Sequence, residues 1–372
     1  MGKKVTVLGA GNAGFALAFH LSHQGHEVAL FEHPDFKQAI EPVQSAGELV
    51  APAEVEGFKA VVHGTAKIAL ATSDIKAAIE FGDVVMIIVP AFGQVPIFQL
   101  ALPHLKDGQI FVSMPGNFAS LQYAKIIKEQ KITKQLYFVD TDSIPYACRK
   151  LQGNQVFISG MKLMLNAGVY PAKDTDKVLT ELQPLFTLKL TKNANALEAA
   201  WANMNMIVHP PPVLFNAGWI EVTKGQFSFY TDGCSPSVCR MMDAVDNERM
   251  AIAAALKLHT KKFIDIDKGW YGETEKYTTY EHIHYGAFHG FFPAPPNLDN
   301  RYIGEDMCYV LLPIRELARR YNISTPATDA MVLAAEIMTE KKLLPQRGFE
   351  LVVKDGESID QMHERLNAWL KD

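Results

Sequence analysis

One residue near the middle of the chain, His209, carries the side chain best suited to proton transfer near neutral pH. Three prolines follow it, Pro210, Pro211 and Pro212, and the stretch Asn195 to Val208 before it has helical spacing. Because prolines cannot continue the helical hydrogen-bond ladder, we expect His209 to end that helix with its ring projecting from the terminus. A histidine in this position is either structural or an acid–base group, and partners elsewhere in the chain decide between the two.

A glycine-rich turn near the N-terminus is the second feature with a chemical meaning. It follows an apolar segment, Lys4 to Leu8, that predicts a buried strand, and it leads into a predicted helix, Phe15 to Ser22, which Gly25 closes. In this setting the GxGxxG pattern is typical of dinucleotide-binding proteins, because glycines let the backbone approach a pyrophosphate at the helix N-terminus. The alternative is a tight turn without a ligand. The predicted cofactor-binding residues of the turn are Gly9, Ala10, Gly11, Asn12, Ala13 and Gly14.

An acidic residue follows the second predicted strand, Val28 to Phe31. Glu32 comes about 20 residues after the first glycine of the turn, where a carboxylate accepts hydrogen bonds from the adenosine ribose hydroxyls. The same carboxylate would repel a 2′-phosphate. The sequence therefore predicts NAD rather than NADP as the cofactor.

Two further predicted strands end in turns that border a ligand in open α/β sheets. Asp83 to Val89 runs into Pro90 and Phe92, and Gln109 to Met114 runs into a turn that contains Asn117. Because ligands of such sheets bind outside the carboxyl ends of the strands, these three turn residues and Gly116 are predicted to border cofactor or substrate. Each of them is equally well explained by an ordinary strand-ending turn.

Composition sets the size of the molecule and excludes one class of partner. A chain of 372 residues with 48% hydrophobic residues and 10% aromatic residues buries a large core and exceeds the usual size of a single domain. The net charge is -5, and acidic and basic side chains are mixed in short runs. Since no basic stripe is present to neutralise phosphates, we expect no nucleic-acid partner.

The N-terminal segment and the cysteine spacing indicate the expected cellular compartment. Met1 to Lys4 runs directly into the first predicted strand, without an apolar signal region, and no apolar span of about 18 residues follows. We therefore expect a soluble, cytoplasmic monomer or homodimer without a membrane partner. The four cysteines lack CxxC spacing, which favours reduced thiols; they are Cys148, Cys234, Cys239 and Cys308.

The pattern of predicted elements changes near Leu190. Strands and helices alternate before it, with a further strand at Leu136 to Val139, and apolar residues recur at helical spacing after it. We predict an α/β fold in which a Rossmann-type doubly wound sheet, residues 1–190, precedes an all-α domain, residues 191–372. Without a linker between the halves, we expect a cleft there. Besides Asn195 to Val208, the predicted helices of the second half are Val245 to Leu258, Met307 to Tyr321 and Thr328 to Met338.

Four motifs of the chain occur in an order that resembles one enzyme family. They are the glycine turn, the segment Asp142 to Arg149, the element Val208 to Pro210, and the run Asn300 to Asp306, which reads Asn-Arg-Tyr-Ile-Gly-Glu-Asp. In this order they resemble the octopine and nopaline dehydrogenase family, the opine dehydrogenases, over nearly the whole chain. The His-Pro element and the Asn-Arg-Tyr run are the most specific parts, since the glycine turn alone fits ketopantoate reductases and glycerol-3-phosphate dehydrogenases equally well.

The resemblance implies a reaction and two site residues. The family condenses an α-keto acid, often pyruvate, with the amino group of an amino acid and reduces the resulting imine with NADH or NADPH. His209 matches the family's catalytic histidine, and Asp306 matches its acidic partner. An imidazole suits carbinolamine dehydration and imine reduction, which both need proton transfer near neutral pH. A carboxylate beside it orients the ring and stabilises its protonated form.

A nearby arginine fits the same chemistry. Arg301 offers a planar fork that grips a substrate carboxylate bidentately, which a lysine does not. The alternative is that Glu305 and Asp306 simply occupy the first turn of the following helix and that Arg301 is their surface partner.

Substrate choice depends on further positions. By the resemblance, Asp142 matches an acidic position that in the octopine enzymes helps to hold a cationic side chain, so an arginine-like or lysine-like amine donor is implied. It is equally well a turn-capping residue in Thr-Asp-Ser. The chain departs from the octopine pattern at residues 203–206, Asn-Met-Asn-Met, where those enzymes place a tyrosine, and this argues against strict arginine specificity. Asn203, Asn205 and Cys148 are predicted by position to line the amine site.

Two groups of histidine and aromatic side chains are candidates for a metal site and for part of a substrate pocket. On a strand, the spacing of His282, His284 and His289 would put the first two on one face, which favours zinc. No acidic or cysteine partner stands at ligand spacing, and the surrounding aromatic residues indicate a packed core or a lid, so we predict no metal. Trp270, beside Tyr271, either shapes the substrate pocket or is packed core.

The sequence therefore predicts an NAD-dependent opine dehydrogenase that acts on the CH–NH group of donors and joins an α-keto acid to an amino acid. Two alternatives remain open. A simple 2-keto acid or ketopantoate-type reductase would need no amine, and a catalytically silent NAD-binding sensor would bind the cofactor without turnover.

Overall fold

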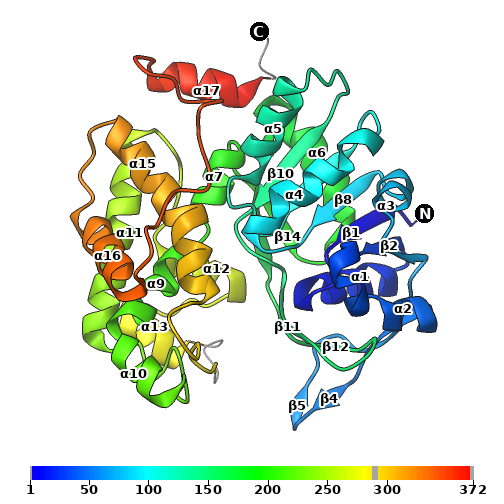
Figure 1. The fold of residues 1–372 in the computed structure, drawn as a ribbon, viewed down its shortest axis with the longest axis horizontal. Helices are drawn as coiled ribbons and strands as arrows, with labels where there is room; N and C mark the ends of the chain where they lie inside the picture. Colours follow the sequence, from blue (N-terminus) through cyan, green and yellow to red (C-terminus); the bar gives the residue numbers. More distant parts are fainter. Residues whose placement is uncertain (1, 287–291, 369–372) are drawn as a thin grey trace. The chain divides into compact units, whose positions relative to one another are not determined.

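The computed structural model describes residues 2–286 and 292–368, which form two compact units (Figure 1). The first unit comprises Met1–Ala200 together with Arg365–Asp372, and the second comprises Trp201–Glu364. Among the described residues, no helix is long and apolar enough to cross a membrane. The boundary between residues 190 and 191 and the cleft expected between the halves stay predictions.

An eight-stranded sheet forms the centre of the first unit, in the order β14-β13-β10-β9-β8-β1-β2-β7. The six strands from β10 to β7 run parallel, β13 pairs antiparallel with β10, and β14 runs parallel to β13. The strands are β1 (Lys4–Leu8), β2 (Glu27–Phe31), β7 (Leu70–Thr72), β8 (Val84–Ile87), β9 (Ile110–Ser113), β10 (Tyr137–Thr141), β13 (Met164–Tyr170) and β14 (Lys189–Lys192).

Helices pack on both faces of this sheet, which is why its strands are continuous apolar runs. On one face, α1 (Asn12–His23) and α6 (Thr175–Leu182) share an apolar core with Val112 of β9. Because successive strand residues point to opposite faces, the neighbouring Phe111 lies on the other face, where it contacts Phe98 of α4 (Ala91–Ala101). Tyr123 of α5 (Ala119–Glu129) stacks on Phe98. The predicted doubly wound sheet is confirmed.

The strand order reverses direction at β1, which places a ligand site. The chain leaves β1 through α1 and enters β2 on one side. After β7 and α3 (Ile75–Phe81) it crosses to β8 on the other side of β1. The loops that follow β1 and β8 therefore flank the topological switch point, where open α/β sheets bind their ligands.

A hairpin that the sequence indicated only as strand-like segments lies beside α1 (Figure 1). It consists of β11 (Tyr146–Lys150) and β12 (Val156–Met161). The buried hydroxyl of Tyr146 lies 2.9 Å from Nδ1 of His20 on α1, so the hairpin is tied to that helix. The other small elements of this region are α2 (Glu41–Ala46) and the strand pairs β3 (Glu48–Ala51) with β6 (Gly64–Lys67) and β4 (Glu54–Val55) with β5 (Phe58–Lys59).

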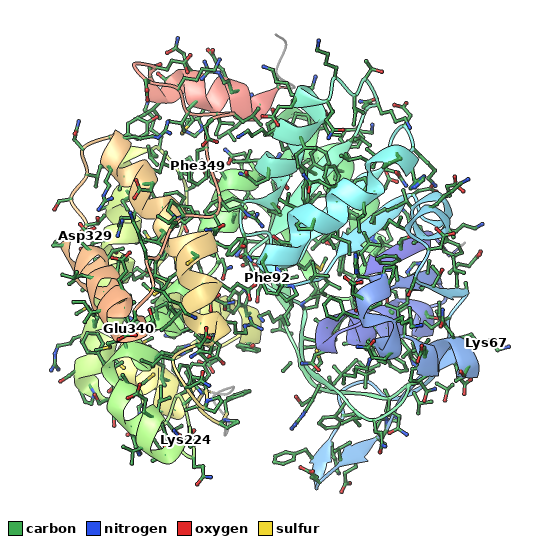
Figure 2. All side chains as sticks on the ribbon, viewed as in Figure 1. Lys67, Phe92, Lys224, Asp329, Glu340 and Phe349 are labelled. Carbon is green, nitrogen blue, oxygen red and sulfur yellow. The ribbon has the colours of Figure 1, made fainter. Side chains whose placement is uncertain are left out.

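The second unit is built from helices, which confirms the predicted all-α architecture. Its centre is the group of α9 (Pro210–Phe215), α11 (Pro236–Ala255) and α16 (Pro326–Thr339), which contact one another (Figure 1). The fully buried Arg249 of α11 pairs with Asp246 at 2.7 Å and donates to Trp201 O at 3.3 Å. The helices of the second unit include α10 (Ala217–Thr223), α11 (Pro236–Ala255), α12 (Phe263–Tyr271), α13 (Thr279–Tyr285), α14 (Arg301–Gly304), α15 (Leu312–Arg320) and α16 (Pro326–Thr339). Lys224 caps the end of α10 (Figure 2). The last helix, α17 (Ile359–Asn367), begins in the second unit and ends in the first.

The single helix predicted from Asn195 to Val208 is wrong. Two short helices occupy this region instead, α7 (Ala196–Trp201) and α8 (Asn205–Val208), and a third, α9 (Pro210–Phe215), follows. The prolines open α9 rather than close a helix, because the first residues of a helix have no intrahelical N–H partner to lose and the fixed φ of proline suits them. His209 lies at the junction, as the C-cap of α8 and the N-cap of α9.

The helix predicted from Val245 to Leu258 also differs at its start. It begins earlier, at Pro236, behind Ser235, whose hydroxyl accepts a hydrogen bond from Val238 N.

Candidate active site

The glycine turn after β1 has the geometry that a pyrophosphate needs. Gly9 has a φ of 112°, which favours glycine, and a Cβ at Gly14 would lie 1.8 Å from Gly9 O. A Cβ at Gly11 would meet no described atom within 4 Å. The first and third glycines therefore allow the strand and helix to pack closely, whereas the middle one leaves space in front of the N-terminus of α1. These residues fit a dinucleotide phosphate.

Glu32 is held against this turn. One carboxylate oxygen accepts a hydrogen bond from Ala10 N at 2.8 Å, and the other accepts one from His33 N at 2.8 Å. The half-buried side chain is thus fixed at the end of β2. That is the position from which an acidic residue receives ribose hydroxyls.

Lys150 is a residue of this region that the sequence did not reveal. Its Nζ donates to Ala10 O at 3.2 Å and to Ala39 O at 2.6 Å, and its N–H donates to the side chain of Asn12. Burial lowers the pKa of Lys150, and the charge of Glu32 opposes that shift. Lys150 belongs to β11, far along the chain from the glycine turn, so no local spacing announces the contact.

The predicted residues after β8 and β9 differ in exposure. Phe92, on the first turn of α4, is 63% exposed, and Pro90 beside it is exposed as well (Figure 2). An exposed aromatic ring at the switch point offers an apolar surface to a ligand. Asn117 is buried, with a φ of 50°, and the following Phe118 is also left-handed, with a φ of 59°. Two such residues in a row store backbone strain of the kind found near functional sites.

In the second unit, the structure brings together the two residues predicted to be catalytic. Nδ1 of His209 lies 2.7 Å from a carboxylate oxygen of Asp306. His209 is 7% exposed and Asp306 is 2% exposed, so water screens the pair little. The ring of His209 also stacks on Tyr302, with ring centres 4.0 Å apart. The imidazole is therefore oriented from its edge and from its face.

Local structure explains why Asp306 is in place. The side chain of Asn300 accepts a hydrogen bond from Tyr302 N at 2.9 Å and so caps the short helix α14. Glu305 ends that helix, and Asp306 comes next and caps a turn of π-helix, Met307–Leu311. Single π-helical turns occur frequently at functional sites. The prediction that Asp306 merely begins an ordinary helix omitted this irregular turn.

Arg301 stands close to this pair as a charged, accessible group. Its side chain is 62% exposed, and Nε lies 3.6 Å from a carboxylate oxygen of Glu305. Partial burial disfavours its charge, but the carboxylates of Asp306 and Glu305 outweigh that effect and raise the pKa of Arg301. The guanidinium is thus positioned to receive an anion from solution.

The residues predicted for the amine site have other evident contacts. Asp142 is fully buried, and its two carboxylate oxygens accept hydrogen bonds from the backbone and the side-chain amide of Asn166. Burial raises the pKa of the Cys148 thiol to about 12. Asn205 begins α8 and its N–H donates to the side chain of Asn203, and Trp270 is buried on α12. Their roles toward a substrate stay predictions.

His282 and His284 lie on a helix, α13, and not on a strand. His282 is fully buried between two carboxylates, with Asp267 at 2.7 Å from Nε2 and Glu273 at 3.1 Å from Nδ1. His284 contacts two backbone carbonyls, and His289 lies outside the described residues. Within residues 2–286 and 292–368, no group of three or more candidate ligands is arranged to hold a metal ion.

Two family models match the chain. Residues 4–136 match the NAD-dependent glycerol-3-phosphate dehydrogenase N-terminus. Residues 192–339 match the NAD/NADP octopine/nopaline dehydrogenase alpha-helical domain. The first match contains the glycine turn and the second contains His209, Arg301 and Asp306.

Whole-length relatives agree with these matches. The opine dehydrogenase of Arthrobacter sp. (strain 1C) is 31% identical over 331 residues, which are 89% of either chain. The octopine dehydrogenase of Pecten maximus is 25% identical over 373 residues, covering 92% of this chain and 91% of that protein. A solved structure of octopine dehydrogenase in complex with NADH and agmatine has the same fold, with a TM-score of 0.74 and 21% identity over 98% of this chain and 95% of that one.

Proposed function

Because this chain belongs to the opine dehydrogenase family, as its motifs predicted, we propose that it joins an α-keto acid, with pyruvate as the first candidate, to the amino group of an amino acid. The enzyme is an NAD(P)-dependent oxidoreductase that acts on the CH–NH group of donors. NAD is its cofactor, and the carboxylate of Glu32 beside the glycine turn disfavours a 2′-phosphate in the same place.

The observation that carries the proposal is the buried contact between His209 and Asp306, with Arg301 exposed nearby. Attack of the amine on the keto carbon gives a carbinolamine, whose hydroxyl must leave as water before an imine exists. Protonated His209 supplies the proton for that step, and Asp306 stabilises the imidazolium until the proton is passed on. When bound, NADH supplies the hydride that reduces the imine carbon.

Arg301 is the group that we assign to a substrate carboxylate. The keto acid carries a carboxylate next to its reacting carbon, and the amino acid carries one on the carbon that bears the reacting nitrogen. A bidentate guanidinium fixes such a group in position and orientation. The neighbouring Glu305 holds Nε at 3.6 Å and so steadies the guanidinium.

The amine donor is the least determined part of the proposal. A cationic donor is supported by the acidic Asp142, but the two hydrogen bonds from Asn166 already use that carboxylate. We therefore propose an amino acid donor without requiring a cationic side chain. The cytoplasmic location and the monomeric or homodimeric state stay predictions.

A matrix of α-keto acids against amino acids tests the proposed function. Loss of NADH absorbance is followed, and the products are identified by mass. We expect NADH consumption only when both substrates are present, with a product mass equal to the reduced condensate. Oxidation of NADH by a keto acid alone would identify a simple reductase instead, and NADH binding without turnover in every well would identify a sensor.

A further inference from the structure

The second ring nitrogen of His209 has a partner that no motif of the sequence indicates. The hydroxyl of Tyr230 lies 3.1 Å from Nε2 of His209. Since Nδ1 faces the carboxylate of Asp306 at 2.7 Å, Nε2 is the nitrogen through which the ring exchanges a proton with anything else. The hydroxyl of Tyr230 stands directly on that route.

We propose that Tyr230 is a further catalytic residue, whose hydroxyl passes the proton from His209 to the leaving oxygen of the carbinolamine. The proposal rests on the proposed function. In this step the O–H bond of Tyr230 breaks as a new O–H bond forms on the substrate hydroxyl, and Nε2–H of His209 gives its proton to the phenol oxygen. The C–O bond of the carbinolamine then breaks, water leaves, and the nitrogen lone pair forms the C=N bond of the protonated imine, which carries the positive charge. Tyr230 ends unchanged, and His209 ends neutral.

Burial of the contact supports a relay. His209 is 7% exposed and stacked on Tyr302, and the hydroxyl of Tyr230 is buried as well, although the residue as a whole is half-buried. Bulk water therefore competes little for the proton between the two side chains. A hydroxyl both donates and accepts, so it can transmit a proton without carrying a charge.

The turn that carries Tyr230 holds the ring firmly. Phe229 N donates to Phe292 O at 2.7 Å, and Cys234 N donates to Tyr230 O at 2.9 Å. The ring of Tyr230 packs edge-on against Phe229 at 5.0 Å and against Phe292 at 5.7 Å. These contacts fix where the hydroxyl points, as a relay requires.

The charges around Tyr230 keep the phenol protonated. Burial raises the pKa of Tyr230 well above its ordinary value, and Tyr302, Cys234, Asp267 and Asp306 act in the same direction. His209 and Arg301 also face the phenol, and the net effect is still a raised pKa of Tyr230. The residue is thus a neutral donor over the whole physiological range, which suits a hydroxyl relay and does not suit a phenolate base.

Removing only the hydroxyl tests the proposal in the full-length enzyme, on the substrate pair found by the matrix. For Tyr230→Phe we expect kcat to fall by about 10- to 100-fold, while the NADH affinity and Tm stay at the wild-type values. Tyr321→Phe is the matched control, because it removes a phenol hydroxyl from a half-buried ring at the end of α15. A wild-type kcat in Tyr230→Phe would overturn the proposal.

A second variant separates proton relay from structural support and decides the matter if Tyr230→Phe does not fold. Site-specific 3-fluorotyrosine at position 230 keeps the hydroxyl and nearly the same shape but makes the phenol more acidic. A relay predicts that kcat changes with the acidity of the phenol while KM, the NADH affinity and Tm stay at the wild-type values, and an unchanged kcat contradicts the relay. His209→Ala, measured in parallel, reports on the proposed function itself, because wild-type turnover there would remove the acid–base role of His209 whatever Tyr230 does.

Discussion

The cofactor turn in the first unit consists of six consecutive residues, Gly9 to Gly14. Its proposed binding groups are backbone N–H groups, and its glycines leave space for the ligand because they have no side chain. The acid–base site in the second unit is assembled from side chains of three separate segments, represented by His209, Tyr230 and Asp306. A backbone site must be contiguous in sequence, because the turn itself is the binding surface. A side-chain site needs only that the fold bring its members together, so its parts can lie 97 residues apart.

This difference predicts that the two sites respond separately to substitution. Changes at His209, Asp306 or Arg301 should alter chemistry or substrate affinity at normal NADH affinity. Changes in the glycine turn should alter NADH affinity and leave turnover at saturating NADH close to normal.

The largest effect is expected for Asp306→Asn. The amide keeps the shape of the side chain but no longer stabilises an imidazolium, so kcat should fall on the order of 10²- to 10⁴-fold. Steady-state kinetics with both substrates saturating measures the loss, and fluorescence titration with NADH checks that affinity is retained. An unchanged kcat would mean that the 2.7 Å contact is structural only.

A smaller effect is expected for Arg301→Lys. The ammonium keeps the charge but loses the bidentate fork, so KM for the substrate whose carboxylate it holds should rise about 10- to 100-fold. The rise should be confined to one of the two substrates and should leave the NADH affinity unchanged. Equal KM values in variant and wild type would return Arg301 to its role as a surface partner of Glu305.

Substitution in the glycine turn should lower the affinity for NADH and leave kcat at saturating NADH close to normal. Gly11→Ala places a Cβ in space that no described atom occupies, so the free energy of unfolding should not fall. The affinity for NADH should drop about tenfold, because the methyl group competes with the pyrophosphate. Gly14→Ala is the contrasting variant, since its Cβ would lie 1.8 Å from Gly9 O and should destabilise the protein. Wild-type NADH affinity in Gly11→Ala would place the phosphate elsewhere.

The smallest expected effect is a pH dependence of stability that arises from His20 in the first unit. Burial lowers the pKa of His20 to about 4, with the charge of His23 adding to the shift. In the unfolded chain His20 has a pKa of about 6.5, so below that pH it takes up a proton in the unfolded state but not in the folded state. The free energy of unfolding therefore falls as the pH drops from 6.5 toward 4, by roughly 2 kcal/mol after allowance for screening. Denaturation at pH 7 and pH 5 should show less pH dependence in His20→Gln than in wild type, with the exposed His63→Gln as control.

The sequence predicted the first unit well because its signals are local. A strand, three glycines and an acid at the end of the next strand lie within 32 residues, and the structure has Glu32 bonded to the turn as the pattern requires. Lys150 was missed because it reaches the turn from a hairpin whose docking on α1 no periodicity encodes.

In the second unit, the resemblance to a family pointed to His209 and Asp306, whereas the local interpretation of the prolines was wrong. The sequence rule that proline ends a helix applies equally to a proline that begins one, and only the structure distinguishes the two cases. Tyr230 stands 21 residues after His209 in a turn of irregular structure, so neither helical nor strand spacing relates them. A tyrosine among other aromatic residues gives no signal of its own until its hydroxyl is seen on Nε2.

The central claim is that acid–base chemistry depends on His209 while cofactor binding does not. The most direct measurement is the single-turnover rate of His209→Ala, started with NADH already bound at a level set by titration of the same sample. We predict an NADH Kd within about twofold of wild type and a rate lower by at least about 100-fold. A wild-type rate at full NADH occupancy would contradict the account.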